Sequence, residues 1–251
     1  MNIGIITGAS SGLGVEFFKE LQKEALDEIW IIARREERLK ENADSYGVLP
    51  TKIIPMDITQ RENLMRLDQM LDSEDVNVKF LINNAGFGAY GAVADSDPYL
   101  QGAMVDLNAR ALTEVTTIAL KYMHERDYII NVCSIASFAP NENLTVYSST
   151  KAYVMSFSRG LRQELKKRKI NVLALCPGPM STEFLQVAGI GKGTSKMFDI
   201  LPRANPAKVA KKAVKLAKRG RAVYTPLALF KVYRVLAKIF PLSWILPICK
   251  S

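Results

Sequence analysis

Hydrophobic and polar positions divide most of this 251-residue chain into two kinds of segment. Short apolar, β-branched runs are typical of strands that are buried on both faces. Between them lie longer segments whose apolar residues recur at helical spacing. The predicted strands are 2–7, 28–33, 52–56, 79–83, 128–133, 170–175 and 222–225. The predicted helices are 15–24, 35–46, 59–71, 99–126, 147–167, one near Pro206 and one after Pro226.

The alternation of strands and helices predicts an α/β fold with a single doubly wound parallel sheet of Rossmann type and helices on both faces. Residues 1–225 are expected to form this domain, and residues 226–251 a basic, apolar C-terminal helix and tail that extends it. Ligands of such folds bind at the carboxyl ends of the strands. In this chain those ends are small or polar: Thr7-Gly8, Ala33-Arg34, Asp57, Asn84-Ala85-Gly86, Ser134 and Pro177-Gly178.

The first strand runs into a turn of glycines and small hydroxyl residues, which continues as a helix. The turn reads Thr7-Gly8-Ala9-Ser10-Ser11-Gly12-Leu13-Gly14. Free N–H groups and the dipole at the start of the helix favour an anion such as phosphate. The glycine spacing differs from G-x-G-x-x-G, and the lysine of a P-loop is missing. Taken alone, the turn is a weak signal, and the alternative is a tight strand-to-helix connection that binds no ligand.

The end of the second strand bears on the choice of cofactor. An acidic residue there would accept hydrogen bonds from the adenosine ribose, but this chain has Arg34 and Arg35. Guanidinium groups match phosphate geometry, so the pair favours NADP(H) over NAD(H). The alternative is that both arginines are solvated charges at a helix start. Asp57 can accept from an adenine amino group or can cap a turn.

A second group of residues has the chemistry for proton transfer. Tyr147 and Lys151 are four residues apart on a predicted helix, so both point into one cleft. The ammonium is expected to lower the pKa of the phenol. Ser134 ends the preceding strand, where its hydroxyl can hold a reacting oxygen. Asn108 is unusual inside a helix and can fix a water beside Lys151. Singly, each residue is better explained by packing, capping or solvation, and only the ordered set favours the chemistry.

Together these motifs resemble the short-chain dehydrogenase/reductase family over roughly residues 1–225. The resemblance implies that Tyr147 is the general acid/base, and that Lys151 lowers its pKa and binds the nicotinamide ribose. It implies that Ser134 orients the substrate oxygen and that Asn108 holds a relay water. The implied cofactor-binding residues are Gly8, Ser10, Ser11, Gly12, Leu13, Gly14, Arg34, Arg35, Asp57, Ile58, Asn84, Ala85, Gly86, Tyr147, Lys151, Pro177, Gly178 and Thr182.

The segment Met180–Asn205 corresponds to the loop that covers the substrate in this family. Its apolar residues favour a hydrophobic ketone or alcohol, although the same residues would serve ordinary packing. Glycines within it are hinge candidates. The apolar residues are Met180, Phe184, Leu185, Val187, Ile190, Met197, Phe198, Ile200 and Leu201, and the glycines are Gly189, Gly191 and Gly193.

The net charge of +9 is concentrated near the C-terminus, because no acidic residue follows Asp199. A local basic block indicates an acidic partner or surface. Thr225-Pro226 is expected to start a helix with a wide apolar face, Lys231, Arg234 and Lys238 on one side, and Trp244 beyond its end. Such a segment suits a membrane surface, and it equally suits packing on the loop or on a second subunit.

The remaining features narrow the class of protein. Cys133 and Cys176 lie in apolar strand-like runs and Cys249 lies in the tail, without a C-x-x-C motif, which favours a reducing, cytoplasmic location. His124 is the only histidine, so no metal site is predicted. No secretory signal or membrane span is expected. Nucleic-acid binding is not expected, because few aromatic residues interleave the basic block.

The leading hypothesis is an NADP(H)-dependent oxidoreductase that interconverts a carbonyl and an alcohol on a hydrophobic small molecule by hydride transfer, with Tyr147 as general acid/base. One alternative is a 3-oxoacyl-[acyl-carrier-protein] reductase whose acidic carrier meets the basic tail. An alternative of another class is a non-catalytic NADP(H)-binding sensor that docks through this tail. By resemblance only, the protein is expected to form a homo-oligomer.

Overall fold

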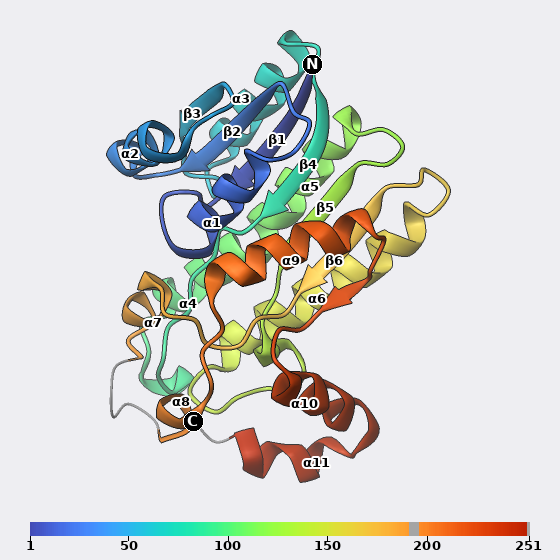
Figure 1. Cartoon of the computed structure of the whole chain (residues 1–251). Coiled ribbons are helices and arrows are strands. Elements are labelled where there is room, and N and C mark those ends of the chain that lie inside the picture. The colour runs from blue at the N-terminus through green and yellow to red at the C-terminus, as the bar shows by residue number, and fades with distance from the viewer. Residues whose placement is uncertain (191–195, 250–251) are drawn as a thin grey trace.

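In the computed structural model, one sheet of parallel strands has the order β3-β2-β1-β4-β5-β6-β7 (Figure 1). The structure describes residues 1–190 and 196–249. The strands are β1 (Asn2–Thr7), β2 (Glu28–Ala33), β3 (Thr51–Pro55), β4 (Asn77–Asn83), β5 (Tyr128–Val132), β6 (Asn171–Leu175) and β7 (Val223–Tyr224). The strand order reverses between β1 and β4. This reversal opens a crevice at the carboxyl ends of the strands, where such sheets bind ligands.

Helices cover both faces of the sheet, as predicted. On one face, α1, α2 and α9 bury apolar residues against the strands, and on the other α3, α5 and α6 do so. The helices are α1 (Gly12–Leu21), α2 (Glu36–Tyr46), α3 (Arg61–Ser73), α4 (Pro98–Val105), α5 (Leu112–Ala119), α6 (Thr145–Glu164), α7 (Glu183–Val187), α8 (Lys196–Ile200), α9 (Pro206–Lys218), α10 (Ala228–Ile239) and α11 (Leu242–Ile245). None of the described helices is long and apolar enough to span a bilayer.

The long helix predicted over 99–126 is not uniform. It consists of α4, a π-helical segment (Asp106–Ala111), α5 and a 3₁₀ turn that ends at Tyr122. The π-helical segment carries Asn108, whose side chain is fully buried. Single π-helical turns inside α-helices often occur at functional sites. The apolar periodicity of the sequence did not reveal this change in helix geometry.

Two predicted helix starts are wrong. Thr59 does not cap α3, because its hydroxyl donates to Asp57 Oδ1 at 2.7 Å and the helix begins after Gln60. The sequence also predicts a capping box, in which Glu62 would pair with Thr59 as N-cap. The N-cap is Gln60 instead, and it makes no side-chain capping bond. Thr225 does not cap α10 either, since it is buried and accepts a hydrogen bond from Arg234 Nη1 at 3.2 Å. Helix α10 instead follows Leu227, which has a φ of 64°.

Candidate active site

A cavity of about 1150 Å³ lies at the carboxyl edge of the sheet and brings together most of the predicted site residues. Two of them do not line it: Gly14 and Asn108 lie behind its wall. The predicted residues that line it are Gly8, Ser10, Ser11, Gly12, Leu13, Arg34, Arg35, Asp57, Ile58, Asn84, Ala85, Gly86, Ser134, Tyr147, Lys151, Pro177, Gly178 and Thr182. The sequence motifs, far apart along the chain, therefore share one space.

The glycine turn brings backbone close to the end of β4. Gly8 has a φ of +69°, and a Cβ at this position would lie 2.8 Å from the Ala85 Cα. A Cβ on Gly14 would lie 2.1 Å from the Gly8 carbonyl oxygen, so this glycine lets α1 start directly against the turn. Ser11 is the N-cap of α1 and its side chain makes no capping bond. The first N–H groups of α1 are thus available to an anion in the cavity.

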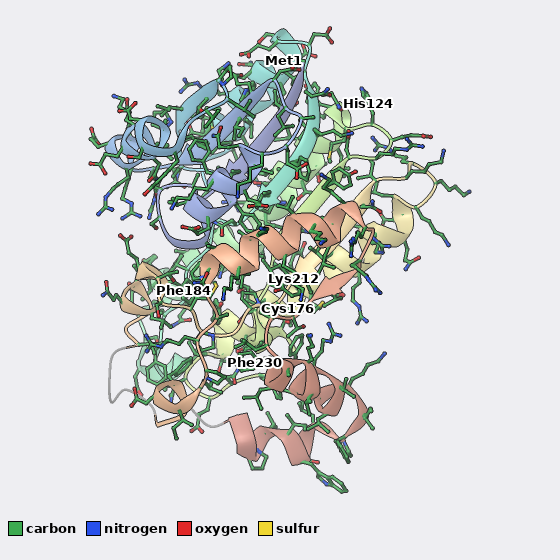
Figure 2. The ribbon with its side chains drawn as sticks, in the orientation of Figure 1. Met1, His124, Cys176, Phe184, Lys212 and Phe230 are labelled. Atoms are coloured by element: carbon green, nitrogen blue, oxygen red, sulfur yellow. The ribbon has the colours of Figure 1, made fainter. Side chains whose placement is uncertain are left out.

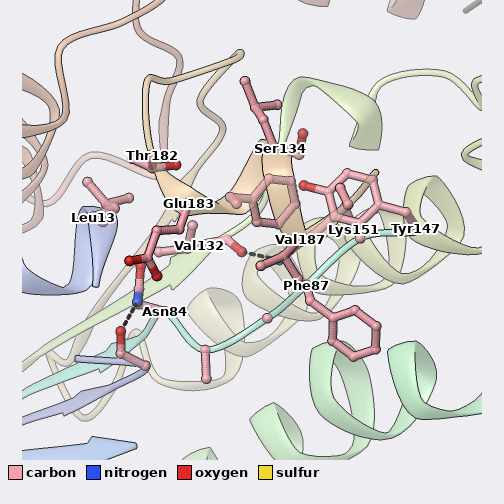
Figure 3. A pocket seen from close by; sticks show the side chains of 18 of the residues that line it. Leu13, Asn84, Phe87, Val132, Ser134, Tyr147, Lys151, Thr182, Glu183 and Val187 are labelled. Carbon is pink, nitrogen blue, oxygen red and sulfur yellow. Dashed lines mark hydrogen bonds between the residues drawn. The ribbon is translucent and has the colours of Figure 1, made fainter. Parts of the chain in front are cut away.

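Asn84 and Thr7 fasten the ends of β1 and β4 to each other. The Asn84 side-chain amide donates to the carbonyl oxygens of Thr7 at 3.1 Å and of Gly8 at 3.0 Å (Figure 3). In return, the Thr7 hydroxyl oxygen accepts from the backbone N–H groups of Asn84 and Ala85, each at 3.1 Å. These bonds hold the glycine turn in position without any ligand.

The Arg35 side chain contacts the glycine turn, and it also contacts an acidic side chain of α7. Its guanidinium donates to Ser11 Oγ at 2.9 Å and to Ser10 Oγ at 3.2 Å. It also forms a 3.0 Å salt bridge with Glu183, the first residue of α7. Hydrogen bonding from Arg35 lowers the pKa of the Glu183 carboxyl. Arg38 lies 3.7 Å from the same carboxylate, and neither Arg38 nor Glu183 was singled out from the sequence.

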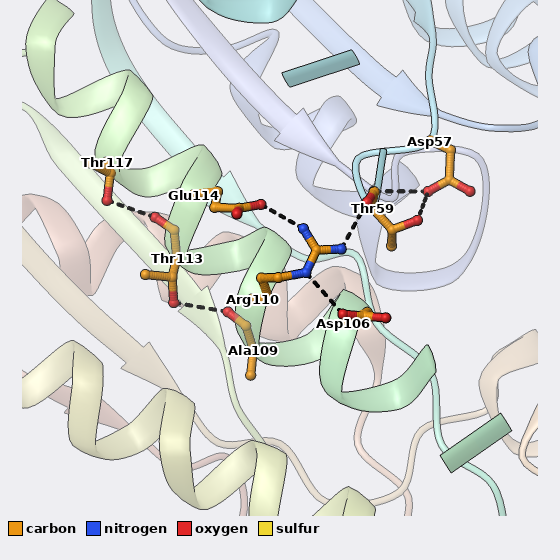
Figure 4. A network of polar contacts seen from close by, with 8 residues as sticks. All are labelled: Asp57, Thr59, Asp106, Ala109, Arg110, Thr113, Glu114 and Thr117. Carbon is orange, nitrogen blue, oxygen red and sulfur yellow. Dashed lines mark hydrogen bonds and ion pairs between the residues drawn. The ribbon is translucent and has the colours of Figure 1, made fainter. Parts of the chain in front are cut away.

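Asp57 has a turn role in the structure. Its Oδ1 accepts from the Thr59 N–H at 2.9 Å and from the Thr59 hydroxyl. Arg110, on the π-helical segment, donates to the Thr59 carbonyl oxygen at 2.8 Å and pairs with Asp106 and Glu114 (Figure 4). Arg110 therefore connects the loop after β3 with the segment that carries Asn108. No pattern in the sequence indicated this contact.

Tyr147 and Ser134 lie side by side at the centre of the cavity (Figure 3). Ser134 follows β5, and its hydroxyl accepts from the Ala136 N–H at 3.1 Å. Tyr147 lies in the first turn of α6 and is 8% exposed. Burial raises the pKa of the Tyr147 phenol to about 12, although hydrogen bonding with Ser134 opposes this shift. The phenol is therefore protonated at neutral pH, in the form that donates a proton.

Lys151 lies one helical turn after Tyr147 and faces the same cavity. Its Nζ donates to the Val132 carbonyl oxygen at 2.9 Å and lies 5.8 Å from the Tyr147 ring centroid. Burial lowers the pKa of Lys151 to about 8. The expectation that Lys151 lowers the pKa of Tyr147 is not met here. The ammonium is itself desolvated and bonded to Val132, and burial of the phenol has the larger effect.

Both the oxygen and the nitrogen of the Asn108 side-chain amide form hydrogen bonds. Its Oδ1 accepts from the Phe87 N–H at 3.0 Å, and its Nδ2 donates to the Phe87 carbonyl oxygen at 2.8 Å. The Nδ2 also donates to Thr150 Oγ1 at 3.1 Å. A Cβ on Gly86 would lie 2.8 Å from Asn108 Oδ1 and 3.3 Å from Lys151 Nζ. Asn108 therefore holds the loop after β4 against α6, directly behind Lys151.

Comparisons with known proteins agree with this arrangement. The family model described as short chain dehydrogenase matches residues 2–193. The chain belongs to the short-chain dehydrogenase family. A curated relative, an uncharacterized oxidoreductase of Staphylococcus epidermidis, is 26% identical over 192 residues, which cover 76% of this chain and 83% of that protein. The protein is accordingly an oxidoreductase of this family.

Solved structures of the family superpose closely on this chain. A short-chain dehydrogenase from Sphingobium yanoikuyae in complex with NADPH has a TM-score of 0.78 and 25% identity, over 96% of this chain and 97% of that chain. A 3-ketoacyl-(acyl-carrier-protein) reductase from Brucella melitensis complexed with NADH has a TM-score of 0.78 and 23% identity, over 90% and 96%. The second likeness shows the fold alone.

A network of buried polar side chains lies behind the site of this dehydrogenase and was not predicted. Asn83 Nδ2 donates to Asn131 Oδ1 at 2.9 Å and to Thr116 Oγ1 at 2.8 Å. Asn131 in turn donates to Ser158 Oγ at 3.0 Å, which links β5 with α6. Asn83 Oδ1 is buried without a hydrogen-bond partner among the described residues. The network connects β4, β5, α5 and α6 directly beneath the cavity.

The described part of the segment 180–205 covers the cavity with apolar side chains. Phe184 of α7 packs against the Tyr147 ring, with centroids 5.6 Å apart. Leu185, Val187, Ile190, Phe198 and Leu201 also line the cavity. Ile200 is exposed and does not line it. Gly191, Gly193 and the side chain of Met197 lie outside the described part of the structure.

The C-terminal helix α10 forms another part of the wall. Phe230 lies between α10 and the body of the domain (Figure 2). A Cβ on Gly178 would lie 2.1 Å from the Phe230 ring, so the glycine after β6 makes room for this side chain. Leu229 and Tyr233 line the same cavity. The sequence alone did not indicate that α10 contributes to the site.

The residues present fit a nicotinamide dinucleotide. Gly8 and Gly14 let the turn, β4 and the start of α1 pack closely, because a Cβ at either position would meet backbone atoms. Arg35 together with the Ser10 and Ser11 hydroxyls forms a donor group suited to phosphate. Lys151 and Tyr147 face the cavity further along.

Proposed function

We propose that this protein is an NADPH-dependent reductase that converts a carbonyl of a hydrophobic small molecule into an alcohol. The observation that carries the proposal is the grouping of Ser134, Tyr147 and Lys151 in one cavity, with a phenol that keeps its proton at neutral pH. A protonated phenol is a proton donor, which a reduction needs at the carbonyl oxygen.

The proposed mechanism assigns one task to each side chain. NADPH, when bound, would supply the hydride for the carbonyl carbon. Tyr147 gives its phenolic proton to the carbonyl oxygen, and Ser134 holds this oxygen by a hydrogen bond. Lys151, when protonated, would bind the nicotinamide ribose through its ammonium group. Asn108 supports Lys151 from behind, since its amide is bonded to Phe87 and Thr150, and solvent returns a proton to the phenolate through Lys151. Pro177, Gly178 and Thr182 would position the nicotinamide.

The preference for NADPH rests on charge at the adenosine end. Arg34 and Arg35 follow β2, where an acidic residue would select NAD(H). Arg35 already contacts two hydroxyls of the glycine turn. The Sphingobium yanoikuyae relative, which was solved with NADPH, supports the same choice. Asp57 and Ile58 are proposed to contact the adenine, since both line that end of the cavity.

The apolar lining supports a hydrophobic substrate. Phe184, Leu185 and Phe198 face the part of the cavity next to Tyr147. Because such pockets bind ligands mainly through apolar contact, a ketone with an alkyl or aryl substituent fits better than a sugar or a charged acid.

Tyr147→Phe tests the catalytic part of the proposal. We expect the reductive kcat with a panel of hydrophobic ketones to fall at least about 100-fold, because the phenol supplies the proton. The Kd for NADPH is expected to change little. The matched control is Tyr153→Phe, since Tyr153 lies on the same helix, half exposed, with its hydroxyl on Thr113. Undiminished turnover of Tyr147→Phe would overturn the assignment.

Arg35→Ala tests the cofactor preference. We expect the preference for NADPH over NADH, measured as the ratio of kcat/KM values, to fall about 10- to 100-fold, because charged hydrogen bonds to phosphate are lost. Glu183→Gln should act in the opposite direction and lower the KM for NADPH about 2- to 5-fold, since the carboxylate competes for Arg35. An unchanged ratio in Arg35→Ala would contradict the proposed phosphate site.

The same assays separate the two alternatives. A 3-oxoacyl-[acyl-carrier-protein] reductase would prefer the carrier thioester over the free ketone, with rates that fall steeply as salt is added. A sensor would bind NADPH without turnover of any carbonyl in the panel. Turnover of small hydrophobic ketones that is insensitive to salt supports the reductase proposed here.

A further inference from the structure

The outer face of α10 and α11 exposes an unusual amount of apolar surface. Ile239 is 69% exposed and Trp244 is 65% exposed. Trp244 stacks on Phe240, with ring centroids 5.9 Å apart, so the two rings form one apolar corner. The exposed apolar residues of this region, called the C-terminal face below, are Leu227, Leu229, Val232, Val235, Leu236, Ile239, Phe240, Leu242, Trp244 and Leu246. Large contiguous apolar patches of this kind mark interaction surfaces.

The arrangement along α10 separates two faces. Phe230, Tyr233 and Ala237 are spaced three and four residues apart and pack toward the domain. Phe230 contacts Gly178, and the ring centroids of Tyr233 and Phe138 are 5.8 Å apart. Val232, Leu236 and Ile239 have the same kind of spacing, but lie on another side of the helix and are exposed. Leu229 lies at the border between the two sides, because it is half exposed and also lines the cavity. The inner face therefore anchors the helix on the domain, and the outer face has no apolar cover within the described part of the chain.

Positive charge borders the C-terminal face. Lys231 and Lys238 are seven residues apart, so they lie on one edge of α10 between its inner and outer faces. No salt bridge among the described residues includes either lysine. The chain has no acidic residue after Asp199, so no carboxylate of this segment offsets the charge. Charge complementarity thus points to a negatively charged occupant.

An apolar stripe beside a basic edge is the pattern of a helix that lies in the plane of a membrane interface. Helix α10 (Ala228–Ile239) is too short to cross a bilayer, because a span needs about 20 apolar residues. The exposed Trp244 and Phe240 suit the headgroup level, where aromatic side chains concentrate. A soluble acidic protein would need the charge but not so much exposed aliphatic surface.

We propose that the C-terminal face docks this enzyme on an anionic lipid surface. The aliphatic residues of α10 and Trp244 enter the headgroup boundary, and Lys231 and Lys238 contact the lipid phosphates. The same helix forms part of the cavity wall through Leu229, Phe230 and Tyr233, so docking places this part of the cavity close to the membrane. An apolar substrate dissolved in the lipid would then be close to the site.

Vesicle flotation of the full chain tests the proposal. Vesicles of phosphatidylcholine alone are compared with vesicles that contain about one third phosphatidylglycerol. We expect binding to the anionic vesicles only, and a blue shift of tryptophan emission on binding. Trp30 is fully buried, so the shift reports on Trp244 and should be absent from Trp244→Phe.

Two pairs of variants separate the apolar and the electrostatic parts. Ile239→Gln with Val232→Gln should lower the partition coefficient at least about tenfold, whereas Val48→Gln with Met65→Gln, which are exposed apolar residues elsewhere, should not change it. Lys231→Ala with Lys238→Ala should lower it about 30-fold. Lys166→Ala with Lys167→Ala removes the same charge from the end of α6 and should have a much smaller effect.

Several outcomes would overturn the proposal. The proposal is wrong if the protein does not bind anionic vesicles. It is also wrong if the variants of α10 bind these vesicles as well as the wild-type protein does. If light scattering shows a dimer that Ile239→Gln and Val232→Gln dissociate, while vesicles are not bound, the face is an interface between copies of this chain. Binding to an acidic carrier protein instead of vesicles would assign it to a protein partner. None of these assays depends on the reductase activity.

Discussion

The cavity wall and the C-terminal face depart from the usual distribution of residues in opposite ways. Around the cavity, polar side chains such as Asn108, Lys151 and Asn131 are buried. On α10 and α11, large apolar side chains such as Ile239 and Trp244 are exposed. Buried polar groups cost free energy unless they are hydrogen-bonded, and exposed apolar groups cost free energy unless something covers them.

The two regions differ in whether contacts within the domain offset this free-energy cost. Lys151 and Asn131, like Asn108, find their hydrogen-bond partners inside the domain. The site is thus held in place before any ligand arrives, which favours catalysis by positioned groups. The C-terminal face has no apolar cover among the described residues. It contributes little to folding and remains available for binding.

Asn108→Leu is expected to have the largest effect on stability. Leucine has a similar size but leaves both the N–H and the carbonyl group of Phe87 without their side-chain partner. Since each unsatisfied group costs roughly 1–3 kcal/mol, the free energy of unfolding should fall by about 4 kcal/mol, measured by urea denaturation. Asn63→Leu, which removes one half-buried bond to Asp57, should cost only about 1 kcal/mol. Equal losses in both variants would contradict the role given to Asn108.

Lys151 should make stability depend on pH. Burial lowers its pKa to about 8 in the folded protein, below the usual 10.5. Between these values the unfolded chain binds more protons than the folded one, so the free energy of unfolding rises with pH. The wild-type protein should gain about 2 kcal/mol relative to Lys151→Met between pH 7.5 and pH 10, measured by urea denaturation without cofactor.

The direction of this effect distinguishes Lys151 from Tyr147. The pKa of the Tyr147 phenol is raised to about 12 from the usual 10. Its contribution therefore appears above pH 10, where the free energy of unfolding decreases as the pH rises. Measurements below pH 10 therefore report on the lysine. A constant difference between wild type and Lys151→Met across that range would show that Lys151 does not titrate there.

The smallest expected effect is that of the C-terminal face on stability. Ile239→Gln and Val232→Gln should each change the free energy of unfolding by less than about 0.5 kcal/mol, because both side chains are mostly exposed in the folded protein. Phe230→Ala, on the inner face of the same helix, should cost about 3 kcal/mol or more, since Phe230 is buried against Gly178. The melting temperatures of these three variants, measured by thermal denaturation, test the comparison. A large loss in Ile239→Gln would mean that the outer face packs against the domain.

Much of the fold was predictable because its signals are local. Strand β2 occupies the predicted residues, and the doubly wound sheet follows from strands that alternate with helices. Boundaries that depend on side-chain contacts from elsewhere were not predictable. Thr59 bonds to Asp57 instead of capping α3, and Thr225 bonds to Arg234 instead of capping α10. The π-helical turn around Asn108 also leaves no trace in the apolar spacing.

The sequence by itself determined the motifs at the strand ends and the spacing of Tyr147 and Lys151, because hydrophobic periodicity and helical repeat act over a few residues. Only the tertiary structure decided the protonation of those two groups, the pairing of Arg35 with Glu183 and the place of Phe230 beside Gly178. Each of these depends on burial or on contact between segments far apart along the chain, and desolvation depends on everything that surrounds a group.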